Sequence, residues 1–309
     1  MKRLWLSLTI IIGLLAIILF GASLYFYHVA IMPGEKTFIK STQQLKSSDP
    51  LYQQKKWFVN VPKKHWQQTS QDGLKLVADY VPAKKPTHKT AIVAHGFMGS
   101  KEKMGAYAAL FHQLGYNVLL PDNRSQGASQ GNAIGYGWLD RKDYLNWARQ
   151  VIRKNGTKSQ IIMFGVSMGA SGMVMASGEP QPTQIKAYIA DSPFTSADAE
   201  ITHQAQQLYH LPKWPLVPLV SLITKVRAGY SFKEANALKQ IQKNHKPIFL
   251  IAGTKDTFVP YQMSQQLYAR ANQPKKLWLV PNAKHVTAFD HYPTLYTHKI
   301  KGFLTHYLP

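Results

Sequence analysis

The chain has 309 residues, 45% of them hydrophobic, and its 37 Lys+Arg residues against 15 Asp+Glu give a formal net charge of +22. This hydrophobic content supports a packed core and excludes a largely disordered chain. The absence of cysteine excludes disulfides, a thiolate nucleophile and lipid attachment to cysteine. The charge favours contact with anionic lipids or envelope polymers. Because the basic residues are scattered and no nucleic-acid-binding motif accompanies them, we expect no nucleic-acid partner.

Residues 1–32 have the pattern of a signal anchor. Lys2 and Arg3 precede an uncharged stretch that continues to the end of this segment, and the stretch exceeds the ~20 apolar residues that a membrane-spanning helix needs. No clean small-x-small cleavage site follows it. We therefore predict an uncleaved, single-pass transmembrane helix in the cell membrane, with the large domain outside the cytoplasm and with Tyr25 and Tyr27 at the outer interface. Cleavage and secretion is the alternative.

The rest of the chain divides into a leader over residues 33–60 and a domain over residues 61–309. The leader is polar and irregular, and we expect a stalk or an ordered segment that packs on the domain. In the domain, strands alternate with helices, beginning with a hairpin around Asp72 and Gly73. The later strands are predicted over residues 90–96, 116–122, 159–165, 185–191, 247–254 and 275–281, and the helices over residues 101–114 (amphipathic), 137–154, from 167 onward, 262–271 and 294–307.

This alternation predicts an α/β fold with a mostly parallel sheet and helices on both faces. It pauses at about residues 192–246, between the sixth and seventh strands. An insertion at this point is expected to form a small helical cap over the carboxyl ends of the strands, with an ordinary helical excursion as the alternative. Its apolar residues predict a hydrophobic acyl pocket, although a role in the core explains them equally well; they are Phe194, Leu208, Tyr209, Trp214 and Leu216.

One motif carries the chemistry. Gly165-Val166-Ser167-Met168-Gly169 reads G-x-S-x-G and stands directly between a predicted strand and a predicted helix. This is the context of a nucleophile elbow, a turn that lifts a serine to the edge of the sheet. The turn needs glycine on both sides of the serine because side chains there would collide with neighbouring backbone.

A serine hydroxyl needs a base, and the base needs a carboxylate to orient it. Among 12 histidines, His285 follows the last predicted strand in a short loop, whereas most others fall on predicted surface, cap or helix segments. Asp256 follows the preceding strand, so the chain order is serine, acid, histidine, as α/β-hydrolases have it. Asp191 is the rival acid, but its neighbours suggest a tight turn in which its side chain accepts from backbone N–H groups.

The oxyanion hole requires two backbone N–H groups. The residue after the nucleophile, Met168, supplies one, and Phe97 in the loop "AHGFMGSKE" is predicted to supply the other. His95 in that loop is expected to brace the turn. No spacing of histidines and aspartates resembles a metal site, and no metal is expected.

The strings "HGFMGSK", "GVSMGA", "DSPF", "GTKDTFVP" and "KH" occur in this order. Over about residues 65–308 the chain thereby resembles the α/β-hydrolase superfamily, and within it the bacterial membrane-anchored serine hydrolases of the esterase and serine-aminopeptidase-like group. The resemblance implies an eight-stranded, mostly parallel sheet whose first pair is antiparallel, a helical cap, and no cofactor. One departure is the loop at residues 122–131, where many relatives read D-x-R-G-x-G-x-S; its role is structural, so catalysis is not in doubt.

These observations predict a serine hydrolase that forms an acyl-enzyme on Ser167, with His285 as base and Asp256 as orienting acid. A carboxylic ester, small or lipid-like, is the favoured substrate. A peptidase or an acyltransferase on envelope substrates is the enzymatic alternative. A non-catalytic envelope-binding protein is the alternative from another class.

Overall fold

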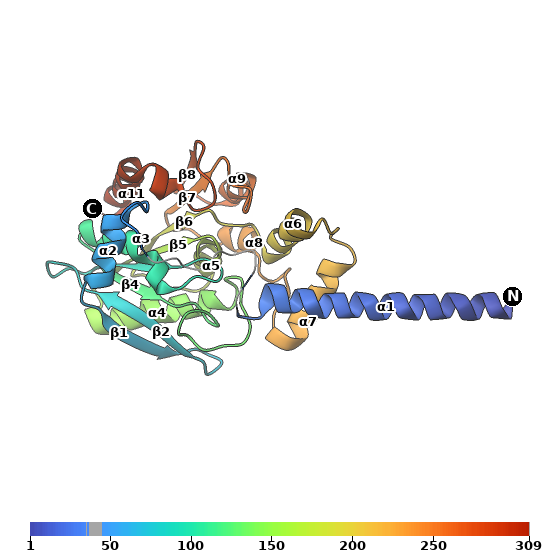
Figure 1. The fold of residues 1–309 in the computed structure, drawn as a ribbon. Coiled ribbons are helices and arrows are strands. Elements are labelled where there is room, and N and C mark those ends of the chain that lie inside the picture. The colour runs from blue at the N-terminus through green and yellow to red at the C-terminus, as the bar shows by residue number, and fades with distance from the viewer. Residues whose placement is uncertain (35, 37–44, 309) are drawn as a thin grey trace.

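The computed structural model describes residues 1–34, 36 and 45–308 (Figure 1). An eight-stranded sheet in the order β1-β2-β4-β3-β5-β6-β7-β8 forms its centre. Only the β1–β2 and β2–β4 pairs are antiparallel, which confirms the predicted mostly parallel sheet and its antiparallel first pair. The strands are β1 (Lys64–Thr69), β2 (Lys75–Val81), β3 (Lys89–Ala94), β4 (Asn117–Pro121), β5 (Gln160–Val166), β6 (Ile185–Asp191), β7 (Ile248–Gly253) and β8 (Lys275–Val280).

Helices cover both faces of the sheet (Figure 1). The central strand β5 shows why: Ile161 and Met163 enter one core cluster, whereas Ile162 and Phe164 enter the other. A strand that is apolar on both faces must be covered on both. One face carries α2 (Tyr52–Asn60), the 3-10 helix η1 (Lys101–Met104), α3 (Gly105–Gln113), α10 (Ala288–His291) and α11 (Pro293–Tyr307), and the other carries α4 (Asp140–Asn155), α5 (Met168–Ser177), α8 (Ala237–Ile241) and α9 (Tyr261–Arg270).

The leader contributes to this covering. Its second half forms α2, which packs against α3, and a Cβ added at Gly105 would lie 2.9 Å from the Phe58 side chain. The predicted amphipathic character of α3 is therefore wrong: every residue from 105 to 112 is buried, because α2 covers the side that solvent would otherwise reach. The predicted stalk also includes residues 35 and 37–44, which lie outside the described residues.

The N-terminal helix α1 (Lys2–Ile31) has two parts. Residues 1–18 are exposed, whereas from Leu19 onward the helix packs against the domain and buries Ser23, Tyr27 and Ile31. By length and composition α1 is a candidate membrane span. The Tyr27 side chain is buried, and the Arg227 guanidinium lies 5.5 Å from its ring centroid. The position of Tyr25 and Tyr27 at the outer membrane interface stays a prediction.

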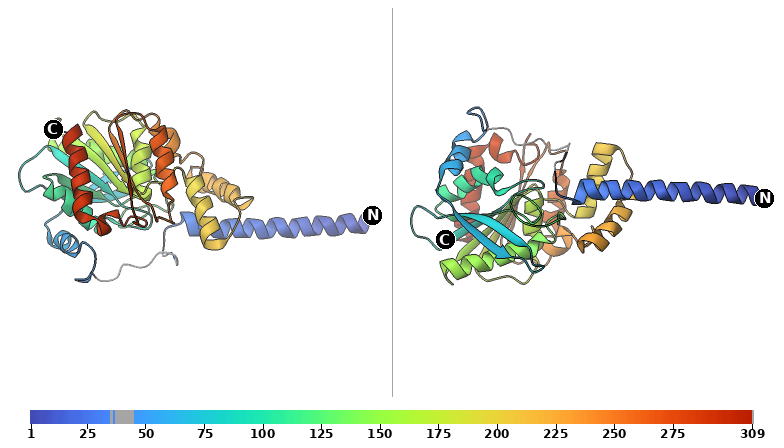
Figure 2. Two further views of the ribbon diagram at one scale, coloured as in Figure 1. Left: turned by 90° about the horizontal axis from the view of Figure 1, so that it is seen from above. Right: turned by 60° about the horizontal axis from the view of Figure 1, so that its bottom comes forward.

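The excursion between β6 and β7 forms the predicted helical cap. It consists of α6 (Ala197–Tyr209) and α7 (Leu216–Ala228), followed by α8. Ser196 caps α6, its Oγ accepting from the Ala199 N–H. Helix α7 packs against α1, and the views agree that both cap helices lie beside the base of α1, where it leaves the domain (Figures 1 and 2).

The two parts of α1 predict different responses to truncation. Removing residues 1–18 deletes only exposed residues, so the melting temperature of the purified protein in detergent should stay unchanged. Removing residues 1–32 also deletes the buried Tyr27 and Ile31 side chains, each of which stabilises the fold by about 1.5–3 kcal/mol. The melting temperature should then fall by about 5 °C or more. Equal melting temperatures for the two truncated proteins would contradict this packing.

Candidate active site

The turn after β5 holds Ser167 in an unusual backbone conformation. It is the N-cap residue of α5, with a φ of 53° and a ψ of −121°. Its N–H donates to the Asp191 carbonyl at 2.8 Å. A Cβ at Gly165 would lie 2.5 Å from the Gly169 carbonyl group, and one at Gly169 would lie 2.5 Å from the His95 carbonyl oxygen. Only glycine permits these approaches. The steric argument made from the sequence is therefore borne out.

The structure brings the three predicted side chains together. His285 Nε2 lies 2.9 Å from Ser167 Oγ, and His285 Nδ1 lies 2.7 Å from Asp256 Oδ2. A carboxylate only accepts hydrogen bonds, so Nδ1 donates to Asp256 and Nε2 accepts the serine proton. The imidazole thus has the tautomer and orientation of a general base for Ser167.

The environments of the two candidate acids differ. Asp256 Oδ1 accepts from the Phe258 and Val259 N–H groups at 2.9 and 2.8 Å, which leaves Oδ2 for His285. Asp191 instead accepts from the hydroxyls of Ser192 and Tyr296. Its partners are hydroxyls and not the backbone N–H groups expected from the sequence. Burial raises the pKa of Asp191 to about 6.

The loop after β3 lies against the nucleophile. A Cβ at Gly96 would lie 3.2 Å from Ser167 Cβ, which places the backbone just before Phe97 beside the serine. Met168 is the first residue of α5, and the first N–H groups of a helix have no acceptor within it. This is the placement that an oxyanion hole requires, and the roles of Phe97 and Met168 stay predictions.

His95 supports this loop. Its Nδ1 donates to the Gly96 carbonyl at 2.8 Å, while its Nε2 accepts from the Asn123 N–H at 3.0 Å. Burial lowers the pKa of His95, so the ring stays neutral. Because one ring nitrogen is bonded within this loop and the other to the loop at residues 122–131, His95 braces the turn, as expected.

The loop at residues 122–131 is structural, also as expected. Asp122 accepts from the Lys101 N–H and from Lys101 Nζ, both at 2.7 Å, and from the Ala128 N–H. Asn123 donates to the His95 carbonyl and accepts from the Tyr144 hydroxyl. Of the residues that depart from the usual pattern, Asn123 makes these bonds and Ser125 Oγ donates to the Ala133 carbonyl at 2.8 Å, whereas the buried Gln126 side chain has no hydrogen-bond partner among the described residues.

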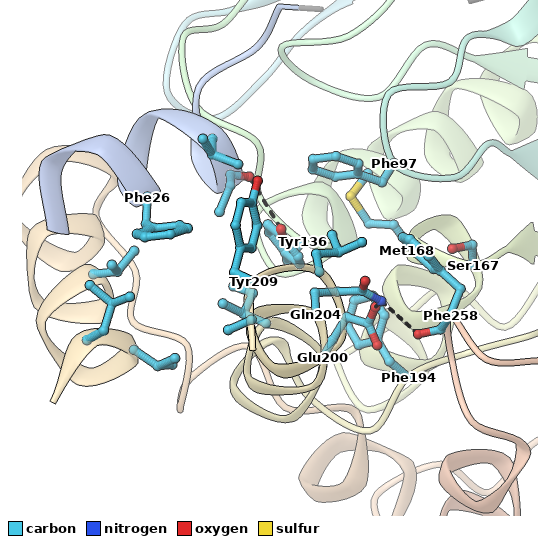
Figure 3. A pocket seen from close by; sticks show the side chains of 18 residues that line it. Phe26, Phe97, Tyr136, Ser167, Met168, Phe194, Glu200, Gln204, Tyr209 and Phe258 are labelled. Atoms are coloured by element: carbon cyan, nitrogen blue, oxygen red, sulfur yellow. Dashed lines mark hydrogen bonds between the residues drawn. The ribbon is translucent and has the colours of Figure 1, made fainter. Parts of the chain in front are cut away.

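An apolar pocket opens on one side of Ser167 (Figure 3). Its cavity volume is about 80 Å³, so it is narrow, and its lining side chains are mostly apolar. Three segments form it: the loops around the serine, the cap helices α6 and α7, and the packed end of α1. Four of the predicted cap residues line it, namely Phe194, Leu208, Tyr209 and Leu216, whereas Trp214 is 71% exposed and does not. The α1 residues that line it are Phe26, Val29 and Ala30.

Among the residues that the structure describes, one carboxyl group lines this apolar pocket. Glu200 is buried, and its Oε1 accepts from Gln204 Nε2 at 2.8 Å, whereas its Oε2 has no hydrogen-bond partner. Burial raises the pKa of Glu200 to about 8, so the group is mostly neutral at pH 7. Gln204 also donates to the Phe258 carbonyl at 2.7 Å, which ties the cap to the Asp256 loop.

A second, wider pocket lies on the other side of Ser167. His285, Lys103 and Tyr107 contribute to its wall, and Lys103 is exposed, so this side reaches solvent. Within the described part of the chain, no group of three or more His, Cys, Asp or Glu side chains is placed to hold a metal ion.

Sequence reasoning missed two contributors to the site. Glu200 carries a weak signal, since it precedes Ile201 and stands four residues before Gln204, on the face of α6 that is apolar. The end of α1 carries no signal, because an apolar helix looks the same whether lipid or protein surrounds it.

Comparison with known proteins places this geometry in a family. Residues 103–309 match the family model described as the prolyl oligopeptidase family. The chain belongs to this family. It is 30% identical over 228 residues to the uncharacterized protein YqkD of Bacillus subtilis, covering 74% of this chain and 75% of that protein. It is 27% identical over 207 residues to the lysophosphatidylserine lipase ABHD12 of Danio rerio, covering 64% of this chain and 51% of that protein.

Solved structures agree with the fold. The Pyrococcus furiosus esterase Pf2001 matches with a TM-score of 0.66 and 25% identity, over 81% of this chain and 95% of that chain. The Pyrococcus horikoshii acylaminoacyl peptidase matches with a TM-score of 0.61 and 16% identity, over 81% and 43% respectively. The chain is a serine hydrolase of the α/β-hydrolase superfamily, and esterases and peptidases are both among its structural neighbours.

The raised pKa of Glu200 predicts a pH-dependent stability. Between its ordinary pKa of 4.5 and its folded value of about 8, the folded state holds a proton that the unfolded state releases. Its stabilising contribution is therefore complete below pH 4.5 and is lost as the pH rises through about 8. Glu200→Gln removes this loss, so the variant should gain at least about 2 °C in melting temperature over wild type between pH 5 and pH 9.

Other titrating groups are the same in both proteins, so the difference in melting temperature between variant and wild type reports on Glu200. Glu234→Gln, on the exposed side of the cap, is the matched control and should not show the same gain. A constant offset between Glu200→Gln and wild type across this pH range would show that Glu200 is ionised in the fold.

Proposed function

We propose that this protein is a carboxylesterase that cleaves esters of apolar acyl chains through an acyl-enzyme on Ser167. The hydrogen-bonded chain from Ser167 through His285 to Asp256, at the inner end of an apolar pocket, is the observation that carries the proposal. The similarity to an esterase and to a lysophosphatidylserine lipase supports it.

The proposed reaction has two steps. Ser167 Oγ attacks the ester carbonyl carbon while its proton passes to His285 Nε2, and the Asp256 carboxylate stabilises the resulting imidazolium. The carbonyl oxygen, now negative, accepts from the Phe97 and Met168 N–H groups. The imidazolium then protonates the leaving alcohol, and a water molecule activated by His285 releases the acyl chain as an acid.

The cellular setting is part of the proposal. The exposed residues 1–18 carry no charged side chain after Lys2 and Arg3, and we place them in the cell membrane with the catalytic domain outside the cytoplasm. Anionic lipids or envelope polymers would then face a chain of net charge +22.

A peptidase is the second candidate, and Glu200 is the observation that favours it. A carboxylate in the pocket beside Ser167 would pair with the ammonium group of a peptide N-terminus. Peptidases also occur among the structural neighbours. The apolar pocket wall favours the ester, since Glu200 is mostly neutral at pH 7 and no other acidic side chain among the described residues lines this pocket.

The first test uses the full-length protein in detergent with a fluorophosphonate probe and with aryl esters and amino-acyl anilides. Wild type should label and should hydrolyse the esters faster than the anilides. Ser167→Ala should abolish labelling and lower ester turnover by at least about 10³-fold. Ser177→Ala, at a buried serine on the far end of α5, is the control and should retain both. Folded wild type that neither labels nor turns over any substrate would contradict a catalytic role.

A second test separates the two acids. Asp256→Asn should lower kcat by about 10⁴-fold, since an amide no longer fixes the tautomer of His285. Asp191→Asn should lower the melting temperature and lower kcat far less than Asp256→Asn does, because the Asp191 carboxylate accepts from Ser192 and Tyr296 and not from the histidine. The reverse pattern would assign the acid role to Asp191.

A further inference from the structure

The packed end of α1 is part of the pocket that receives the acyl chain. Phe26, Val29 and Ala30 line the pocket whose inner end is Ser167, and Figure 3 shows Phe26 at the end away from the serine. The Phe26 ring also packs edge-on against Tyr209 of the cap at 5.0 Å. A helix that served only as a tether would need none of these contacts.

The length of the free part of α1 sets the height of the pocket above the membrane. Residues 2–18 are exposed, and at 1.5 Å per residue they span about 26 Å. A bilayer core is about 30 Å thick, so the free part alone is slightly too short to cross it. Counted from Leu4, about 20 residues cross the core, which ends the span near Ser23. Phe26 follows one turn later, at the level of the lipid headgroups.

The cap presents apolar side chains on the same side of the domain. Trp214, Leu222 and Val226 are 71%, 60% and 79% exposed, and they belong to the segment that lies beside the base of α1 (Figures 1 and 2). Exposed apolar side chains next to a membrane helix are suited to contact with the bilayer.

We propose that α1 forms one wall of the acyl pocket and that the substrate is a single-chain acyl ester of a polar alcohol, which enters from the bilayer along α1. This rests on the proposed esterase function. The acyl chain occupies the apolar pocket between α1, α6 and α7. The alcohol occupies the second pocket, which reaches solvent beside the exposed Lys103.

The test uses full-length protein in nanodiscs. Val29→Trp fills the pocket from the α1 side, and Ile18→Trp places the same side chain on the exposed part of the same helix. The ratio of kcat/KM for p-nitrophenyl decanoate to that for p-nitrophenyl acetate should fall about tenfold in Val29→Trp. It should match wild type in Ile18→Trp. An unchanged ratio in Val29→Trp would overturn the proposed wall.

Entry from the bilayer has its own measurement. Lysophosphatidylglycerol and a monoacylglycerol are supplied either in the vesicles that hold the enzyme or in separate vesicles at the same total concentration. Hydrolysis should be faster in the shared vesicles, and equal rates would overturn entry from the bilayer. If only the lysophospholipid shows this behaviour, an anionic headgroup is required; if both do, any polar alcohol suffices.

The outcomes distinguish this inference from the function on which it rests. Wild type that hydrolyses p-nitrophenyl acetate and labels with fluorophosphonate, but shows neither the change of ratio nor the advantage of shared vesicles, contradicts the inference alone. Wild type without labelling or any ester turnover contradicts the proposed function. If Val29→Trp melts well below wild type, Val29→Ala takes its place and should shift the preference toward longer acyl chains.

Discussion

The approach of backbone to backbone around Gly165 and Gly169 is the constraint on which the site depends. The turn after β5 can be this tight only because neither position carries a side chain, and the tightness seats Ser167 against the ends of β3 and β6. Parallel strands end at one edge of a sheet, so the loops after β7 and β8 reach the same place. The register of the sheet thus determines the distances between Ser167, His285 and Asp256.

Hydrogen bonds link the cap helix α6 to the loop that carries Asp256. Gln204 of α6 donates to the Phe258 carbonyl, and His203 Nε2 lies 2.9 Å from the Thr257 carbonyl, so α6 holds the loop that presents Asp256. The same helix lines the apolar pocket through Glu200. A substrate that displaces α6 therefore acts on the orientation of His285 as well as on its own binding.

Much of this arrangement could be predicted from the sequence, because it depends on local signals. Short apolar runs and helical patterns predicted the strands and most helices, and the placement of Ser167, Asp256 and His285 directly after strands predicted the order of the site. The burial of α3 and of Tyr27 could not be predicted, because each depends on a distant segment that packs over it. The burial of Glu200 could not be predicted for a related reason: a carboxyl group on a helix is usually solvated, and only the assembled cap removes the solvent.

Helix α1 shows the limit of pattern reasoning most directly. Lipid and protein interior are both apolar, so one continuous apolar helix can leave the bilayer and enter a protein core without a change in composition. In the proposed arrangement, the acyl chain of the substrate likewise moves from the bilayer into the protein. Moving a methylene group into water costs about 0.8 kcal/mol, and that cost over a whole chain would make extraction through solvent slow. A pocket whose wall begins at the bilayer surface avoids it, since the chain passes from one apolar environment to another while the ester reaches Ser167.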